Sequence, residues 1–290
     1  MIWACTSVLL AAVSLPVAAP ATIVVAYESG VDAYAEALEG IGATLGSSNL
    51  RIVDLHGADA DLTRALGSRD VQLVIAVGSR AVAEVQARKV LVPTIAAMTL
   101  HGGDASGTGR VDLDIPLSTQ LQAIRSLWPD RLRVGIIRNP ARSRYTTEML
   151  ESRARKEGFT VLVVDCDGPA RLLKAVASMK GKVDFLLCFP DPDLYNSVTI
   201  KPLVMASLEG RMPLVGFSPA FVRAGAAAGI YPDYRETGRQ AAEMAQRLLR
   251  GEDRGPDTGP RKIQLAVNQR VARLLGIEFH PGTLPLEVFK

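Results

Sequence analysis

Two stretches of this chain follow the same pattern, Thr22–Tyr27 (TIVVAY) and Arg133–Arg138 (RVGIIR). Each is an apolar run of strand length, and further landmarks repeat behind them in the same order. Four landmark pairs, at spacings of 111, 111, 112 and 120 residues, are Ile23 and Val134, Gly57 and Gly168, Val71 and Val183, and Pro93 and Pro213. The order of these landmarks indicates an internal repeat.

Apolar strand candidates alternate with amphipathic helical stretches in both halves of the repeat. In the first half the candidates are the strands Thr22–Ala26, Arg51–Leu55, Leu73–Val77 and Thr94–Ala97 and the helices Val31–Leu45 and Asp59–Leu66. This alternation is typical of a parallel sheet with right-handed crossovers. Chance can produce the same rhythm in any doubly wound protein, but the strands are too many for one small sheet. We therefore predict an α/β protein with two Rossmann-like lobes, each built on a parallel sheet.

The composition agrees with a folded two-lobed protein. The 290 residues are enough for two domains of about 100 to 150 residues each. Apolar residues make up 48% of the chain and charged residues 22%, close to the average for globular proteins. The 33 Lys and Arg residues are interspersed with 30 Asp and Glu residues and form no basic stripe, so we predict no nucleic-acid partner.

The start of the chain has the features of a secretory signal peptide. The first charged residue is Glu28, and Val8–Ala19 is rich in Ala, Val and Leu. We predict a signal peptide over residues 1–21 and a mature start at Thr22, although the usual positive charge near the first residue is missing. A membrane anchor is the alternative, but a serine and a proline interrupt a stretch already shorter than the roughly 20 residues of a span. The predicted location is the periplasm.

The sequence predicts neither a metal site nor a cofactor loop. Removal of the signal peptide leaves only Cys166 and Cys188, too few for a disulfide framework, and we expect buried thiols. The three histidines lie far apart in the sequence and lack metal-ligand spacing. Gly40–Gly46 (GIGATLG) resembles a dinucleotide loop, but its third glycine is one position late and it follows a helical pattern.

Candidate binding residues come from a general rule for parallel sheets. Ligands bind beyond the carboxyl ends of the strands, where helix N-termini present free N–H groups. The residues at these positions are Tyr27, Glu28, Ser29, Gly78, Ser79, Arg80, Met98 and Thr99 in the first lobe, and Asn139, Asp191, Asp193, Phe217 and Ser218 in the second. Hydroxyl groups, opposite charges and aromatic rings together favour a zwitterion or another small polar molecule over a nucleotide.

Each of these residues also has a purely structural interpretation. Arg80 can be a solvated helix residue, and Asp193 can be the N-cap of a following helix. Asn139 precedes a proline and suits a turn as well as a ligand contact. Tyr27 and Phe217 follow strands directly and can belong to the core. On the binding interpretation, Ser79 and Arg80 hold a carboxylate, and Glu28, Asp191 or Asp193 receives an ammonium group.

A hydrolase is the weaker hypothesis. Gly216–Ala220 (GFSPA) resembles the nucleophile elbow of α/β-hydrolases, with Ser218 after a strand. The residue after the nucleophile must supply an N–H to the oxyanion hole, and here that residue is Pro219, which has none. We therefore predict no enzymatic activity.

A longer segment resembles a known family. Pro213–Gly251 (PLVGFSPAFVRAGAAAGIYPDYRETGRQAAEMAQRLLRG) is similar to the corresponding part of ABC-transporter substrate-binding proteins related to the tryptophan and tyrosine uptake components. Further matches are VGSRAV from Val77, the stretch Val183–Asp193, and NQRVARLLGI over Asn268–Ile277. The resemblance covers nearly all of the chain after residue 21, and the GRQAA helix with its LLRG end is its most specific part.

The resemblance implies a type I periplasmic binding protein, whose two lobes are joined by a three-stranded hinge and close by bending. The implied first lobe is residues 22–116 plus 232–255, and the second is residues 117–231 plus 256–290. Asp233 would then lie at the hinge beside the ligand. Ser79 and Arg80 stand where relatives often carry a smaller, uncharged pair, so the amino-acid ligand of the relatives is carried over only as one option.

We therefore expect a monomeric solute-binding protein that captures a small molecule between its lobes and delivers it to an ABC permease in the membrane. The alternative is a sensory module of the same fold, read by a receptor kinase. The sequence does not separate these two roles.

Overall fold

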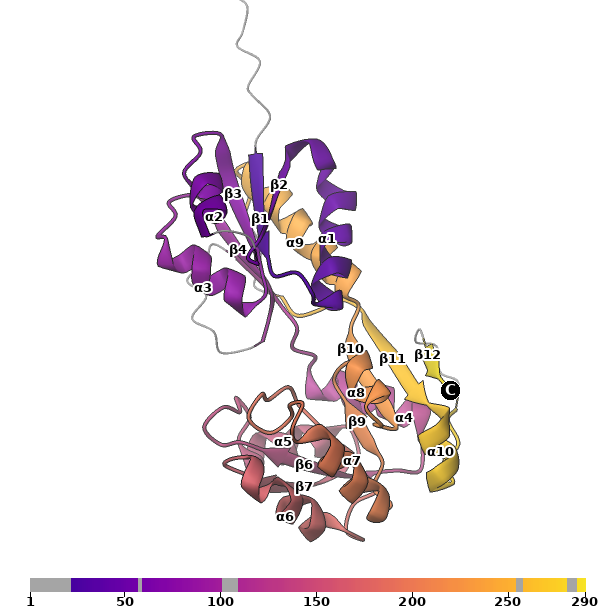
Figure 1. Ribbon diagram of the computed structural model, residues 1–290. Helices are drawn as coiled ribbons and strands as arrows, with labels where there is room; N and C mark the ends of the chain where they lie inside the picture. Colours follow the sequence, from indigo (N-terminus) through magenta and orange to yellow (C-terminus); the bar gives the residue numbers. More distant parts are fainter. Residues whose placement is uncertain (1–21, 57–58, 101–108, 254–257, 281–285) are drawn as a thin grey trace, which may run out of the picture.

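The computed structural model describes residues 22–56, 59–100, 109–253, 258–280 and 286–290, and the predicted signal peptide (residues 1–21) lies outside them. The strands form two separate sheets, one in each of two lobes (Figure 1). Within the described part of the chain, no helix is both long and apolar enough to cross a membrane.

The first lobe contains a five-stranded, fully parallel sheet in the order β2-β1-β3-β4-β5. Its strands are β1 (Thr22–Tyr27), β2 (Leu50–Asp54), β3 (Val71–Val77), β4 (Thr94–Thr99) and β5 (Gly109–Asp112). Its helices are α1 (Asp32–Leu45), the short 3-10 helix η1 (Ser47–Asn49), α2 (Asp59–Leu66), α3 (Ser79–Ala87) and α9 (Tyr234–Leu249). Helix α9 comes from the far end of the chain and lies beside α1 (Figure 1).

The second lobe contains a seven-stranded sheet in the order β12-β11-β10-β9-β8-β6-β7. Its strands are β6 (Arg133–Arg138), β7 (Thr160–Asp165), β8 (Phe185–Leu187), β9 (Leu214–Gly216), β10 (Ala228–Pro232), β11 (Ile263–Asn268) and β12 (Leu286–Phe289). Only β10 and β11 pair in antiparallel fashion. Its helices are α4 (Leu117–Leu127), α5 (Thr147–Lys156), α6 (Pro169–Met179), α7 (Ile200–Glu209), α8 (Pro219–Arg223) and α10 (Gln269–Leu275).

The two sheets confirm the predicted fold and repeat their strand order. The order β2-β1-β3-β4 of the first lobe recurs in the second as β7-β6-β8-β9. Each β-α unit predicted from the landmark pairs therefore occupies the same place in its lobe. The shared order supports the internal repeat because chance similarity in rhythm does not fix the order in which strands pair.

The chain passes between the lobes in three segments, which lie beside one another. They follow β5, β10 and α9, respectively. The Asp233 N–H donates to the Lys262 carbonyl (2.9 Å), and the Asp112 N–H donates to the Thr258 carbonyl (3.0 Å). The Gln240 side chain joins the third segment to α9, since its amide donates to the Gly259 carbonyl (3.1 Å). The predicted lobe boundary at 116 lies between β5 and α4, the one at 231 lies within β10, and the one at 255 lies outside the described residues, so the exact division into lobes stays a prediction.

Both cysteines within the described residues lie in the core of the second lobe. Cys166 and Cys188 are unpaired and buried, in agreement with the predicted thiols. Burial raises the pKa of Cys188 to about 12, against a smaller opposing effect of the Tyr195 hydroxyl. This thiol therefore stays protonated at neutral pH.

Candidate functional site

A cavity of about 290 Å³ lies between the two lobes, at the carboxyl ends of their strands. Its wall combines residues from α1, α3 and β4 of the first lobe with residues from the loops of the second lobe and from the segments that join them. The lining residues are Tyr34, Ser79, Met98, Leu100, Leu113, Asp114, Ile115, Gln120, Arg142, Ser143, Arg144, Tyr145, Phe189, Pro190, Phe217, Ser218, Ile230, Pro232 and Tyr234. A molecule in this cavity would contact both lobes at once.

Five aromatic rings supply much of the cavity wall. Tyr145 lies 5.7 Å from Phe189, measured between ring centroids, and the guanidinium groups of Arg144 and Arg153 lie 4.8 and 5.0 Å from its ring centre. The two guanidinium groups are attracted to the electron-rich face of the Tyr145 ring and help to hold it in place. Burial and the nearby Glu28 carboxylate raise the pKa of Tyr34, so its hydroxyl is neutral and can donate a hydrogen bond.

The polar groups of the cavity include one ion pair near the hinge. Arg144 Nη1 lies 3.4 Å from Asp114 Oδ2, and Arg144 Nη2 donates to the Tyr145 hydroxyl (2.7 Å). The buried Gln120 amide donates to the Ile115 carbonyl (2.8 Å). Ser79 is the first residue of α3, so free N–H groups of the helix start lie close to it. The cavity can therefore hold a carboxylate near the first lobe and an apolar or aromatic group among the rings.

Two backbone conformations shape the cavity wall. Gly78 has φ +88°, and a Cβ at this position would lie 2.5 Å from the Tyr34 ring. Met98 is a buried residue with φ +59°, in a region that residues with side chains rarely adopt. It lies where the pairing of β4 with β5 shifts register, as expected of a β-bulge that redirects a side chain. Strain of this kind concentrates at functional sites.

Four of the predicted contact residues line the cavity: Ser79, Met98, Phe217 and Ser218. Ser218 is also the N-cap of α8, since its hydroxyl oxygen accepts a hydrogen bond from the Phe221 N–H (3.3 Å). The strand-end rule found these residues because Ser79 lies two positions after β3, Phe217 and Ser218 are the first two residues after β9, and Met98 is the penultimate residue of β4.

The other contact residues predicted in the first lobe are not part of the cavity wall. Arg80 Nη1 donates to Glu28 Oε1 (2.6 Å), so Arg80 is more than a solvated helix residue. The Ser29 N–H donates to the Asp54 carboxylate (3.0 Å). Tyr27 packs at the edge of the first-lobe core. Thr99 is buried, and its hydroxyl has no hydrogen-bond partner among the described residues.

The remaining residues predicted in the second lobe form a small network at the rim, and the predicted hinge residue Asp233 lies at the start of α9. The Asp193 carboxylate pairs with Arg142 and accepts from the Asn139 amide (3.5 Å). Asp191 Oδ1 accepts from the Asp193 N–H (2.8 Å), so Asp191 rather than Asp193 stabilises the start of this turn. Asp233 is the N-cap of α9, where it accepts from the Glu236 N–H (2.9 Å).

Most residues of the cavity wall were not among the predicted contacts. The missed side chains with chemical character are Tyr34, Asp114, Gln120, Arg142, Ser143, Arg144, Tyr145, Phe189 and Tyr234. Phe189 lies two positions after β8 and could have been found by the strand-end rule. The others lie on helices, on a hinge segment or deep in a loop, where no periodic signal marks them.

The chain is similar to a curated bacterial protein over part of its length. The tyrosine-binding protein of Clostridioides difficile (strain R20291) is 25% identical over 181 residues, which cover 61% of this chain and 51% of that protein. The chain thus matches about half the length of this curated relative.

Two solved structures share the fold. The ligand-free, open structure of a substrate binding protein with adhesive properties from Clostridium difficile matches with a TM-score of 0.73 and 17% identity, covering 93% of this chain and 99% of that one. An ABC domain from Streptococcus pneumonia in complex with L-Trp matches with a TM-score of 0.61 and 20% identity, covering 90% and 96%.

A family model places the chain more directly, because it spans most of the two lobes. The model described as "ABC transporter substrate binding protein" matches residues 60–284, well over half of the chain. The two-lobed fold, the shared cavity and this match lead to one conclusion: the chain belongs to the ABC transporter substrate-binding protein family.

Proposed function

We propose that this protein is the solute-binding component of an ABC importer and that it closes its two lobes over a small molecule, namely an amino acid. The observation that carries the proposal is the cavity, whose wall is shared by both lobes and combines five aromatic rings with arginine, serine and glutamine side chains. Affinity for a ligand in such a place depends on both lobes, so binding and closure are coupled.

The wall favours an amino acid with an aromatic or large apolar side chain. Tyr145 and Phe189 offer stacking surfaces, while Ser79 at the start of α3 and Arg144 near the hinge offer donors to a carboxylate. The names of two related proteins, one tyrosine-binding and one solved with L-Trp, support the same class of ligand. We propose Ser79, Met98, Phe217 and Ser218 as contacts, and assign Glu28, Arg80, Asn139, Asp191, Asp193 and Asp233 to the surroundings of the site.

We propose that residues 1–21 direct secretion, that the mature protein is a periplasmic monomer without catalytic activity, and that its closed form delivers the ligand to a membrane permease. The use of Ser218 as a helix cap argues against a nucleophile. A receptor kinase that reads the closed form remains the alternative partner.

Calorimetry and thermal unfolding of residues 22–290 test the ligand. L-tyrosine, L-tryptophan and L-phenylalanine should each be compared with L-aspartate and L-lysine. A ligand present at about a hundred times its Kd stabilises the folded state by about 2.7 kcal/mol, which raises Tm by several degrees. Binding of none of the apolar amino acids would remove the proposed ligand class.

A matched pair of variants tests the cavity. Tyr145→Ala removes a ring from the wall and should weaken binding of L-tyrosine by at least about tenfold, since the ring and its stacking contact are both lost. Leu274→Ala changes a residue on α10 that is 66% exposed and does not line the cavity, and it should leave Kd unchanged. Equal affinities of the two variants would contradict the assignment.

Uptake measurements separate import from sensing. A strain that lacks the gene should lose uptake of the labelled ligand if the protein serves an importer. Unchanged uptake together with a lost transcriptional response to the ligand would instead favour the receptor kinase.

A further inference from the structure

An ion pair occupies the first-lobe rim of the cleft. Arg80 Nη1 donates to Glu28 Oε1 at 2.6 Å, and the His56 ring lies 3.4 Å from the same oxygen. The side chains of Arg80 and Glu28 are 48% and 28% exposed, so water and salt reach the pair. An exposed pair of this kind is weak, and its partners can be exchanged at little cost.

A second ion pair occupies the rim of the second lobe. Arg142 Nε pairs with Asp193 Oδ2, and Arg142 Nη2 lies 3.3 Å from Asp193 Oδ1. The Asn139 amide also approaches this carboxylate (3.5 Å). The Arg142 and Asp193 side chains are 54% and 41% exposed, so this pair is as easily exchanged as the first.

The internal repeat gives the two pairs opposite polarity. Glu28 follows β1 and Arg142 follows β6, and these are equivalent strands of the two lobes. Arg80 follows β3 and Asp193 follows β8, which are again equivalent. After β1 the first lobe therefore carries a carboxylate, whereas the second lobe carries a guanidinium after the equivalent β6. After β3 the first lobe carries a guanidinium, whereas the second lobe carries a carboxylate after the equivalent β8.

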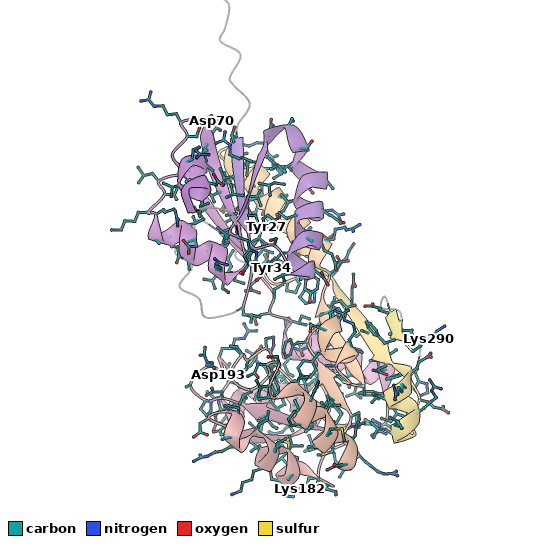
Figure 2. All side chains as sticks on the ribbon, in the orientation of Figure 1. Tyr27, Tyr34, Asp70, Lys182, Asp193 and Lys290 are labelled. Carbon is teal, nitrogen blue, oxygen red and sulfur yellow. The ribbon has the colours of Figure 1, made fainter. Side chains whose placement is uncertain are left out.

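The two rims belong to opposite walls of one cavity. Ser79, next to Arg80, lines the first-lobe wall, and Arg142 lines the second-lobe wall. Figure 2 shows Asp193 on the side of the second lobe that faces the first, and Tyr34 on the opposing side of the first lobe. The closure proposed above would bring these walls together and carry unlike charges toward each other.

We propose that the two pairs exchange partners when the lobes close, so that Arg80 pairs with Asp193 and Arg142 pairs with Glu28. Two pairs within lobes then become two pairs between lobes, and no charge loses its partner. Because the number of ion pairs is the same in both forms, the exchange links the lobes in the closed form at little net electrostatic cost. This inference rests on the proposed function, because it needs a ligand-driven closure.

Charge swaps within each lobe test the exchange. The first-lobe swap, Glu28→Arg with Arg80→Glu, keeps a pair within the lobe but places like charges across the closed cleft. The second-lobe swap, Arg142→Asp with Asp193→Arg, does the same. The combination of both swaps restores unlike charges across the cleft. Calorimetric Kd values for L-tyrosine and L-tryptophan are measured for the wild type, both swaps and the combination.

The expected result is a strong coupling between the swaps. The Kd of the combined variant should be at least about tenfold lower than the Kd obtained by multiplying the fold-changes of the two separate swaps. This difference should become smaller in 1 M salt, because salt screens the charges. If the effects of the two swaps on the binding free energy simply add, the exchange is overturned. Residues that only contact the ligand or support their own lobe do not couple across the cleft.

A variant that fails to fold and a wild type that fails to bind are each recognised separately. If a swap fails to fold, judged by its thermal unfolding, the cycle is repeated with Glu28→Gln and Arg142→Gln, which should again couple. If the wild type binds neither amino acid, the proposed ligand class fails, and this is visible before any variant is measured. Binding by the wild type with additive swaps overturns the exchange alone.

Discussion

Gly78 lies between β3 and α3 with φ +88°, and its missing side chain leaves room for the Tyr34 ring. We expect Gly78→Ala to cost about 1–2 kcal/mol of unfolding free energy, because the left-handed backbone disfavours a Cβ. It should also weaken ligand binding, since the new Cβ would lie 2.5 Å from a ring that lines the cavity. Urea unfolding and calorimetry check both effects. Gly42→Ala is the control, because a Cβ at Gly42 meets nothing within 4 Å.

A single carboxylate ties together two strands of the second lobe. Asp184 accepts from the Leu132 N–H (3.0 Å), the Arg133 N–H (2.8 Å) and the Arg133 guanidinium (2.7 Å). Burial alone would raise the pKa of Asp184, but the hydrogen bonds and charge of Arg133 outweigh it, and the pKa is lowered. Since the folded-state pKa lies below the unfolded value near 4, this stabilisation is present above about pH 4 and is lost as the pH falls through the folded-state pKa.

We therefore expect Asp184→Asn to lower the unfolding free energy by about 1–2 kcal/mol at pH 7. The difference from the wild type should disappear as the pH is lowered toward 2. Urea unfolding at a series of pH values measures it, with the exposed Asp130→Asn as control. A difference that stays constant with pH would show that the carboxylate charge plays no part.

At the level of elements, helices α1 and α9 approach each other through glycines. A Cβ at Gly238 would lie 2.0 Å from the Ala37 carbonyl oxygen, and a Cβ at Gly40 would lie 2.0 Å from the Arg235 carbonyl oxygen. We expect Gly238→Ala to force the helices apart and to cost about 2–3 kcal/mol in urea unfolding. An unchanged unfolding midpoint would contradict this close packing. Gly42→Ala, on the same helix as Gly40, again serves as control.

The bounds of some helices and strands were easier to predict from the sequence than the residues of the cavity wall. Arg133–Arg138 and Asp59–Leu66 have the predicted bounds because their apolar periodicity alone defines them. The cavity wall was predictable only at the carboxyl ends of strands, where Ser79, Met98, Phe217 and Ser218 lie. Tyr145 reaches the wall from deep in a loop, and the path of such a loop depends on tertiary contacts that no local pattern records.

For the whole molecule, the internal repeat predicted two lobes, and the two sheets confirm them. The resemblance over Pro213–Gly251 predicted the family, and the match over residues 60–284 confirms it. The close packing of α9 on α1 was not predictable, because the GRQAA motif identifies the helix but not the surface that its small residues contact.

Closure of the whole molecule is a measurable prediction of the proposed function. We expect saturating L-tyrosine to reduce the radius of gyration in small-angle X-ray scattering, because the hinge brings the two lobes together. L-aspartate, at the same concentration, should leave the radius unchanged. Binding of L-tyrosine by calorimetry without any compaction would show that the ligand occupies an open cleft.

The buried thiols of the second lobe make the molecule convenient to label. Cys166 and Cys188 are both enclosed by the core, and the Cys188 thiol stays protonated at neutral pH. A maleimide dye should therefore react with one newly introduced surface cysteine and leave these two untouched. A fluorophore attached near the mouth of the cleft would change its surroundings as the lobes move, and the labelled variant would thereby become an optical reporter of its own ligand.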